Sequence, residues 1–127
     1  MSQVVFDTSI VLAWLHNEPG SDQIAALIPF AVLSTVNAAE AQSKLVRDGV
    51  DSKVAWNSVI SSVPTILSFN PAQAECAGSL IQKTQPYGLS LGDRACLALA
   101  MALDAPVYTT DRAWIQLHLA VEIRMIR

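Results

Sequence analysis

Near the start of the sequence, the stretch Val4-Val5-Phe6-Asp7 has three consecutive apolar residues followed by an acid. Such a run lacks the alternation of a half-exposed strand and predicts a short strand that is buried on both faces. Four more short runs along the chain resemble it. The expected strands are residues 4–6, 31–33, 65–69, 106–108 and 121–126.

Helical patterns fill the segments between these runs. Ser34 or Thr35 can cap one helix and Gly49 can stop it, while Asn70-Pro71 has the usual N-cap and N1 arrangement of another. The expected helices are residues 10–15, 22–28, 35–48, 51–62, 71–85, 91–103 and 113–117. Alternating strands and helices predict an α/β fold: a short, mostly parallel central sheet of four to five strands with helices on both faces.

Composition narrows the class of protein. The 127 residues suit one compact domain, residues 1–127, and 52% hydrophobic against 15% charged residues argues against disorder. No apolar run approaches the roughly 20 residues that span a bilayer, and no basic segment precedes the first run, so we expect a cytoplasmic protein. A net charge of −3 is not that of a general nucleic-acid binder. Cys76 and Cys96 match no zinc or redox motif and are expected as reduced core residues.

Four acids stand where α/β proteins usually bind ligands. Asp7 follows the first expected strand, and Asp111 follows the fourth. Asp93 begins the helix over 91–103, and Glu40 lies on a stripe of small and apolar residues in the helix over 35–48. Because ligands of open α/β sheets bind beyond the carboxyl ends of the strands, we expect these side chains to share one site.

Four neighbouring carboxylates repel one another and stay ionised only if cations are bound among them. All-oxygen ligands favour hard cations such as Mg²⁺ or Mn²⁺, and there is no His/Cys set that would indicate zinc. The chemistry typical of such a site is phosphoryl transfer, in which a metal-activated water attacks phosphorus and metal stabilises the leaving oxygen.

A simpler interpretation explains each acid separately. Asp7, Asp93 and Asp111 each precede or open a helix, where an acidic cap stabilises by about 0.5–2 kcal/mol. Ser90 with Asp93 fits a variant capping box, and Glu40 stands four residues before Lys44, as in a routine surface pair. Capping suffices for any one residue, but four acids at matching topological positions favour a shared site.

Longer motifs around these acids resemble one family. Val5-Phe6-Asp7-Thr8-Ser9 is similar to the opening motif of PIN-domain nucleases, and the order and spacing of the other acidic positions agree over essentially the whole chain. The three further matching segments are Asn37-Ala38-Ala39-Glu40, Leu89 to Ala98 with Ser90-Leu91-Gly92-Asp93-Arg94, and Pro106 to Trp114 with Thr109-Thr110-Asp111-Arg112-Ala113-Trp114.

The small size and the last two segments look most like VapC-type toxins of toxin–antitoxin systems. This resemblance implies a PIN-like fold and a Mg²⁺- or Mn²⁺-dependent endoribonuclease that acts on an RNA substrate. It also implies a homodimer silenced by a cognate VapB-type antitoxin. Asp7, Glu40, Asp93 and Asp111 would be the catalytic and metal-binding residues, with Ser9 or the Thr110 hydroxyl supporting metal or water.

Two arginines follow site acids, and two interpretations of them stay open. Arg94 and Arg112 could clamp a phosphate of the RNA or could pair with neighbouring acids. The apolar residues Ile24, Ala25, Leu27 and Ile28 could form part of a groove for an antitoxin helix or belong to the core.

Other classes of protein fit less well. A receiver domain needs paired acids after the first strand and a lysine after the last, and a haloacid-dehalogenase-type phosphatase needs an acid where Ser9 stands. A binding module whose acids serve only as helix caps stays open as the alternative.

Overall fold

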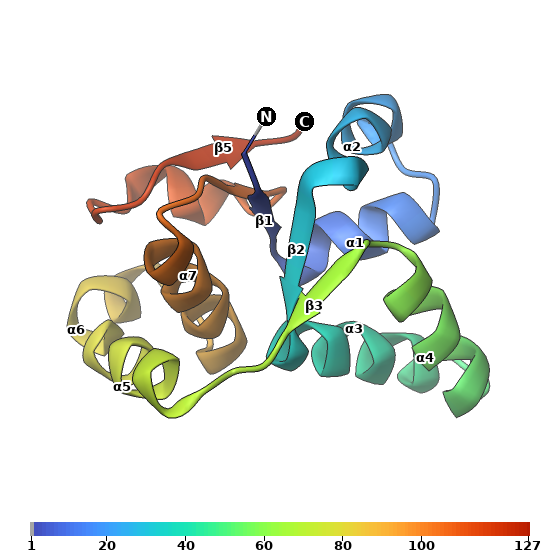
Figure 1. Ribbon diagram of the computed structural model, residues 1–127, viewed down its shortest axis with the longest axis horizontal. Helices are drawn as coiled ribbons and strands as arrows, with labels where there is room; N and C mark the ends of the chain where they lie inside the picture. Colours follow the sequence, from blue (N-terminus) through green and yellow to red (C-terminus); the bar gives the residue numbers. More distant parts are fainter. Residues whose placement is uncertain (1) are drawn as a thin grey trace.

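A five-stranded sheet forms the centre of the computed structural model, which describes residues 2–127 (Figure 1). Its order is β3-β2-β1-β4-β5, and every neighbouring pair is parallel. The strands are β1 (Val4–Phe6), β2 (Ala31–Ser34), β3 (Thr65–Leu67), β4 (Val107–Thr109) and β5 (Ile123–Met125). The prediction of a short parallel sheet is therefore confirmed, and the strand that opens the chain lies in the middle of it.

Helices cover both faces of this sheet. They are α1 (Thr8–Leu15), α2 (Ser21–Leu27), α3 (Thr35–Arg47), α4 (Ser52–Ser61), α5 (Pro71–Ser79), α6 (Ile81–Thr84) and α7 (Leu91–Leu103), with 3₁₀ turns η1 (Ile28–Phe30), η2 (Gln85–Tyr87) and η3 (Arg112–Gln116). Figure 1 shows α1 to α4 gathered on one side and α5 to α7 on the other.

Alternate residues of the central strand enter two separate cores. Val4 and Phe6 pack into the cluster formed with α1, α2, α3 and α4, whereas Val5 packs into the cluster formed with α7 and η3. All three side chains are at most 1% exposed. Both faces of β1 are covered, as the sequence predicted, and this explains why its residues are apolar throughout and do not alternate with polar ones.

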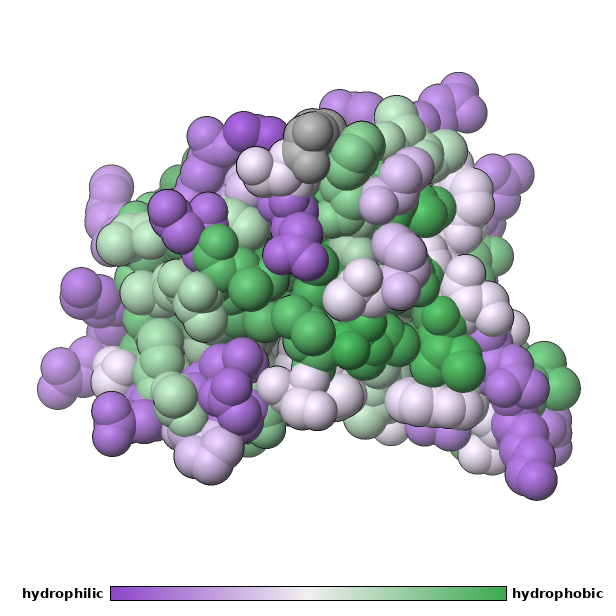
Figure 2. Space-filling model, viewed as in Figure 1, coloured by the Kyte–Doolittle hydropathy of each residue, from purple (hydrophilic) through white to green (hydrophobic). Residues whose placement is uncertain are grey.

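The edge strand β3 is less protected than the central strands. Its residues are all only partly buried, and Figure 2 shows hydrophobic side chains in a broad band across the face of the molecule that β3 crosses. No helix in the part of the chain that the structure describes could cross a bilayer by length and apolarity.

Several predicted boundaries were wrong. The helix expected over 71–85 is divided into α5, α6 and η2; the Ser79 hydroxyl donates to the Cys76 carbonyl at 2.8 Å, and Pro86 has no N–H to continue the helix. The helix expected over 113–117 is the 3₁₀ turn η3. Strand β4 ends one residue later than predicted, at Thr109, and β5 is shorter because it pairs only with the three residues of β4.

We expect the central strand to be intolerant of a polar atom. Val5→Thr keeps the side-chain shape but buries a hydroxyl at a fully covered position, which should lower the free energy of unfolding by about 1–3 kcal/mol. Val54→Thr is the control, because Val54 is 55% exposed on α4 and should change stability by less than about 0.5 kcal/mol. Urea unfolding of both variants measures the difference, and equal losses would contradict burial of β1 on both faces.

Candidate active site

Asp7 is a buried carboxylate at the carboxyl end of the central strand. It is 3% exposed and caps α1. Its Oδ1 accepts from the backbone N–H of Ser9 at 2.7 Å and of Ile10 at 3.2 Å, and from the Ser9 hydroxyl. Its Oδ2 accepts from the Thr109 hydroxyl at 2.6 Å. Both oxygens are thus held, which fixes the direction of the carboxylate.

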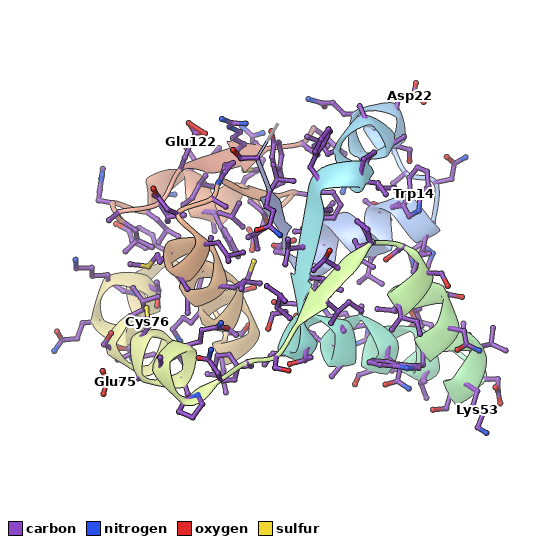
Figure 3. All side chains as sticks on the ribbon, in the orientation of Figure 1. Trp14, Asp22, Lys53, Glu75, Cys76 and Glu122 are labelled. Carbon is purple, nitrogen blue, oxygen red and sulfur yellow. The ribbon has the colours of Figure 1, made fainter. Side chains whose placement is uncertain are left out.

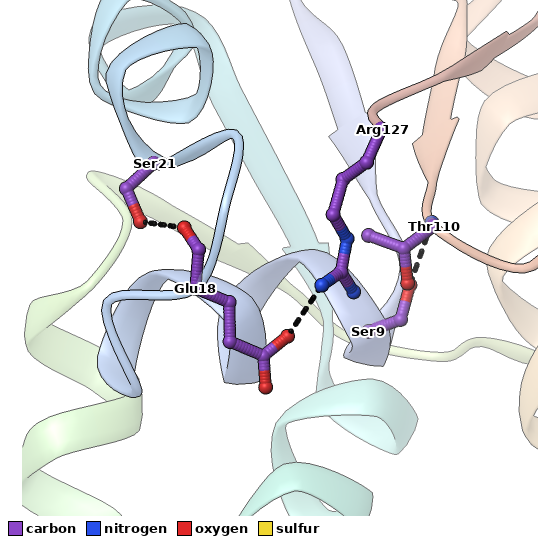
Figure 4. Close-up of polar contacts among 5 residues, drawn as sticks. All are labelled: Ser9, Glu18, Ser21, Thr110 and Arg127. Atoms are coloured by element: carbon purple, nitrogen blue, oxygen red, sulfur yellow. Dashed lines mark hydrogen bonds and ion pairs between the residues drawn. The ribbon is translucent and has the colours of Figure 1, made fainter.

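Thr109 connects Asp7 to the next acidic segment. Its Oγ1 also accepts from the backbone N–H of Asp111 at 3.0 Å, and the backbone N–H of Thr110 donates to the Ser9 hydroxyl at 2.9 Å (Figure 4). The hydroxyls of Ser9 and Thr109 thus both contact Asp7, and Thr110 takes part through its backbone N–H. Support of a metal or water by Ser9 or Thr110 stays a prediction.

Glu40 lies on α3 against the start of α7. Its carboxylate accepts from the Thr8 hydroxyl, and a Cβ built on Gly92 would stand 2.7 Å from its Oε2. No side chain larger than hydrogen fits at Gly92 without moving Glu40. The surface pair with Lys44 is not among the ion pairs of the described residues, so the expectation of an inward-facing Glu40 has structural support.

Asp93 and Asp111 both cap the elements that they begin. The Asp93 carboxylate accepts from the Ser90 backbone N–H at 2.9 Å while the Ser90 hydroxyl accepts from the Asp93 N–H at 3.2 Å, which completes a capping box. Asp111 is exposed and accepts from the Ala113 N–H at 3.0 Å. The capping interpretation is therefore correct for Asp7, Asp93 and Asp111, and it leaves carboxylate lone pairs free for a further role.

The pKa values of two of the acids are raised. Burial, with a smaller contribution from the charge of Asp93, raises the pKa of Asp7 from 3.8 to about 6 against the opposing hydrogen bonds from Ser9 and Thr109. The pKa of Asp93 is also raised, first by burial, with contributions from the charges of Glu40 and Asp111. Asp93 therefore connects the four predicted acids electrostatically: its charge acts on Asp7, and the charges of Glu40 and Asp111 act on Asp93.

A divalent cation fits this site by donor chemistry. The donors are carboxylate and hydroxyl oxygens, which suit Mg²⁺ or Mn²⁺, and a cation would offset the cost of ionising Asp7 and Asp93. Within residues 2–127 no three His, Cys, Asp or Glu side chains already form a group that could hold a metal ion.

The two arginines beside the acids have different surroundings. The Arg94 guanidinium donates through Nη1 to the Ala77 carbonyl at 2.8 Å, which joins α7 to the end of α5. Arg112 is exposed. In the described chain neither forms an ion pair with a site acid, which removes the acid-pairing interpretation from both.

Three other acids lie away from the site, whereas one cysteine lies near it. Figure 3 shows the acidic side chains of Asp22, Glu75 and Glu122 at the periphery of the molecule. Both cysteines are free, as expected; Cys96 is buried, and its thiol pKa is raised well above normal by burial, then by the charges of Asp7, Asp93 and Glu40. Cys76 is only partly buried.

We expect Asp7→Asn to stabilise the chain when divalent cations are absent. The folded pKa of about 6 lies above the ordinary 3.8, so the folded state binds more protons between these values and loses stability as pH rises through them. Above pH 6 the loss amounts to roughly 3 kcal/mol, and an uncharged amide avoids it. Urea unfolding in EDTA at pH 5 and pH 7.5 measures the gain, which should be larger at pH 7.5.

Asp51→Asn is the matched control. Asp51 caps α4 through the N–H groups of Lys53 and Val54 but is exposed, and Asn and Asp are equivalent caps. Its stability should stay within about 0.5 kcal/mol of the parent. A destabilised Asp7→Asn variant at pH 7.5 would show that ionisation of the buried Asp7 carboxyl does not lower the stability of the folded chain.

Gly92→Ala should lack the stability gain that alanine usually gives in a helix. The new Cβ meets the Glu40 carboxylate, whereas a Cβ at Gly78 on α5 has nothing within 4 Å. Gly78→Ala is therefore expected to gain about 0.5–1 kcal/mol in urea unfolding. Equal gains in both variants would mean that the Glu40 carboxylate does not occupy the space beside Gly92.

Comparisons with known proteins agree with the observed fold. No curated protein sequence shows a significant match to the chain. Among solved structures, VapC20 from Mycobacterium tuberculosis, a Sarcin-Ricin loop cleaving toxin, is 18% identical with a TM-score of 0.75, over 94% of this chain and 99% of that chain. A chain of VapBC2 from Rickettsia felis, bound to a promoter DNA fragment, is 16% identical with a TM-score of 0.73, over 96% and 97%.

A toxin–antitoxin complex from Klebsiella pneumoniae contains a chain that is 20% identical with a TM-score of 0.70, over 95% of this chain and all of that one. At sequence identities this low, the structural similarity shows a common fold alone. The model of the PIN domain family matches residues 4–118, which include all four site acids. The chain therefore belongs to the PIN domain family.

Proposed function

We propose that the chain is a divalent-metal-dependent endoribonuclease that hydrolyses phosphodiester bonds of RNA. The observation that carries this proposal is the buried Asp7 carboxylate at the carboxyl end of the central strand of a PIN-domain sheet, where burial and then the charge of Asp93 raise its pKa. The charges of Glu40 and Asp111 act in turn on Asp93. An acidic site of this kind needs a cation, and phosphoryl transfer is the chemistry that an oxygen-bound cation supports.

The four acids would hold Mg²⁺ or Mn²⁺. When bound, the ion would supply a water that ionises near neutral pH and would neutralise charge at the phosphate. Ser9 and Thr109 orient the Asp7 carboxylate through both of its oxygens, and Thr109 also fixes the backbone of Asp111. The exposed Asp111 leaves one side of the site open to a large substrate.

Arg112 is the better candidate for a contact with RNA phosphate. It is exposed next to Asp111, whereas the Arg94 guanidinium is engaged by the Ala77 carbonyl. A local cation of this kind is needed because the chain carries a net charge of −3, which gives RNA no general attraction.

The similar structures support a role as the toxin of a toxin–antitoxin pair. VapC20 is a toxin that cleaves the sarcin–ricin loop, and the Rickettsia felis relative comes from a VapBC complex. We infer that the partner is a VapB-type antitoxin, that the chain forms a homodimer, and that it acts in the cytoplasm. Of the residues suggested for an antitoxin groove, Ile24 is buried in the core, whereas Ala25 is exposed and Leu27 and Ile28 are partly buried.

RNA cleavage by the purified chain, freed of any antitoxin, tests the proposal. We expect cleavage of structured RNA with Mn²⁺ or Mg²⁺, none with EDTA, and a loss of at least roughly 100-fold in rate for Asp7→Asn and Asp93→Asn. Asp22→Asn is the control, since Asp22 lies at the periphery and its variant should keep the parent rate (Figure 3).

Full activity in Asp7→Asn or Asp93→Asn would refute the assignment of the site. If the unmodified chain neither cleaves RNA nor binds a divalent cation by calorimetry at millimolar metal, the acids are helix caps alone, and the chain is a binding module.

A further inference from the structure

Asn37 is a buried amide that touches three segments of the candidate site. It lies on α3 and is 1% exposed. Its Nδ2 donates to the Thr8 hydroxyl oxygen at 3.2 Å and to the Gly92 carbonyl at 3.1 Å. One side-chain nitrogen thus joins α3 to the start of α1 and to the first turn of α7.

The direction of these hydrogen bonds follows from the carbonyl partner. The Gly92 oxygen can only accept, so the Asn37 group that faces it must be the amide nitrogen. Thr8 then receives a hydrogen from Asn37 and keeps its own hydrogen for Glu40, to which it donates. Asn37 therefore sets the direction of the hydroxyl that holds the Glu40 carboxylate.

Glu40 and Asn37 stand three residues apart on α3, so they share one face of the helix. Both reach Gly92: Asn37 through the Gly92 carbonyl, and Glu40 through the space that the missing Cβ leaves. Asp93 is the next residue of the chain. The two contacts together fix α3 against the start of α7, and hence Glu40 relative to Asp93.

Both hydrogen bonds of Asn37 are made by its side-chain nitrogen. Its Oδ1 is buried and has no hydrogen-bond partner among the described residues. Asn37 is therefore held by Nδ2, through Thr8 and Gly92.

We propose that Asn37 is a positioning residue of the metal site, acting through Thr8 on Glu40. The proposal rests on the function proposed above, since it assumes that Glu40 binds the ion. In this proposal Asn37 acts on the metal site through Thr8 rather than as a ligand of the ion.

Asn37→Leu removes both hydrogen bonds and keeps the number and branching of the side-chain heavy atoms. We expect it to weaken Mn²⁺ binding, measured by calorimetry, about tenfold and to lower kcat for RNA cleavage about tenfold or more, with KM for RNA changed less than about threefold. Gln73→Leu is the matched control, because Gln73 is also a buried helical amide (7% exposed) with an unpartnered oxygen, on α5 outside the site. It should leave Mn²⁺ binding and kcat unchanged.

The path through Thr8 is tested by a double-mutant cycle. Thr8→Val removes the hydroxyl that donates to Glu40 at constant shape, so it should weaken Mn²⁺ binding to the same degree as Asn37→Leu. If Asn37 acts through Thr8, the double variant binds Mn²⁺ no more than about threefold less tightly than either single variant. Fully additive losses, or equal Mn²⁺ binding by Asn37→Leu and the parent, would overturn the proposal.

The two proposals fail in different ways. If the parent binds Mn²⁺ but cleaves no RNA, while Asn37→Leu binds Mn²⁺ more weakly, the ribonuclease proposal is wrong and the role of Asn37 stands. If the parent binds no Mn²⁺, both are wrong. Should Asn37→Leu fail to fold, Asn37→Ala, which also removes both hydrogen bonds, is measured in its place against the same criteria.

Discussion

The burial of the Asp7 carboxylate is the constraint on which the site depends. A carboxylate that is 3% exposed is expensive to ionise, and the structure offsets this only in part through the hydrogen bonds of Ser9, Ile10 and Thr109. Those bonds order the surrounding chain, because Thr109 also holds the backbone of Asp111. The unfavourable part that remains would favour the binding of a cation in the proposed function.

Helix capping and ion binding are compatible uses of the same acids. Asp7, Asp93 and Asp111 each accept from backbone N–H groups at the start of an element, which fixes where each carboxylate stands. Such a bond uses only some of the lone pairs of a carboxylate, so the other lone pairs can face a shared volume. A parallel sheet favours this arrangement, since its strands end and the following helices begin at one edge.

The strands and the positions of the acids depend on local sequence pattern and were predicted, whereas side-chain contacts that depend on strand register were not. The unbroken apolar run before Asp7 correctly predicted a strand covered on both faces, and the acids after β1 and β4 were placed correctly. The resemblance pointed to the hydroxyl of Thr110, whereas the hydroxyl that contacts Asp7 is that of Thr109, one residue earlier in β4, and neighbouring residues of a strand face opposite sides. The role of Asn37 could not be predicted, because its hydrogen-bond partners Thr8 and Gly92 lie 29 and 55 residues away in the sequence. The three-residue spacing to Glu40 was the only local sign that the two side chains share a helix face.

The central claim is that acids distant in sequence share one divalent ion. Anomalous diffraction from crystals of the unmodified chain soaked in Mn²⁺ tests it most directly, because the signal locates the metal itself. We predict a peak in contact with carboxylate oxygens of Asp7 and at least one of Glu40, Asp93 and Asp111. Peaks confined to peripheral acids such as Glu75 or Glu122, with none beside Asp7, would contradict it.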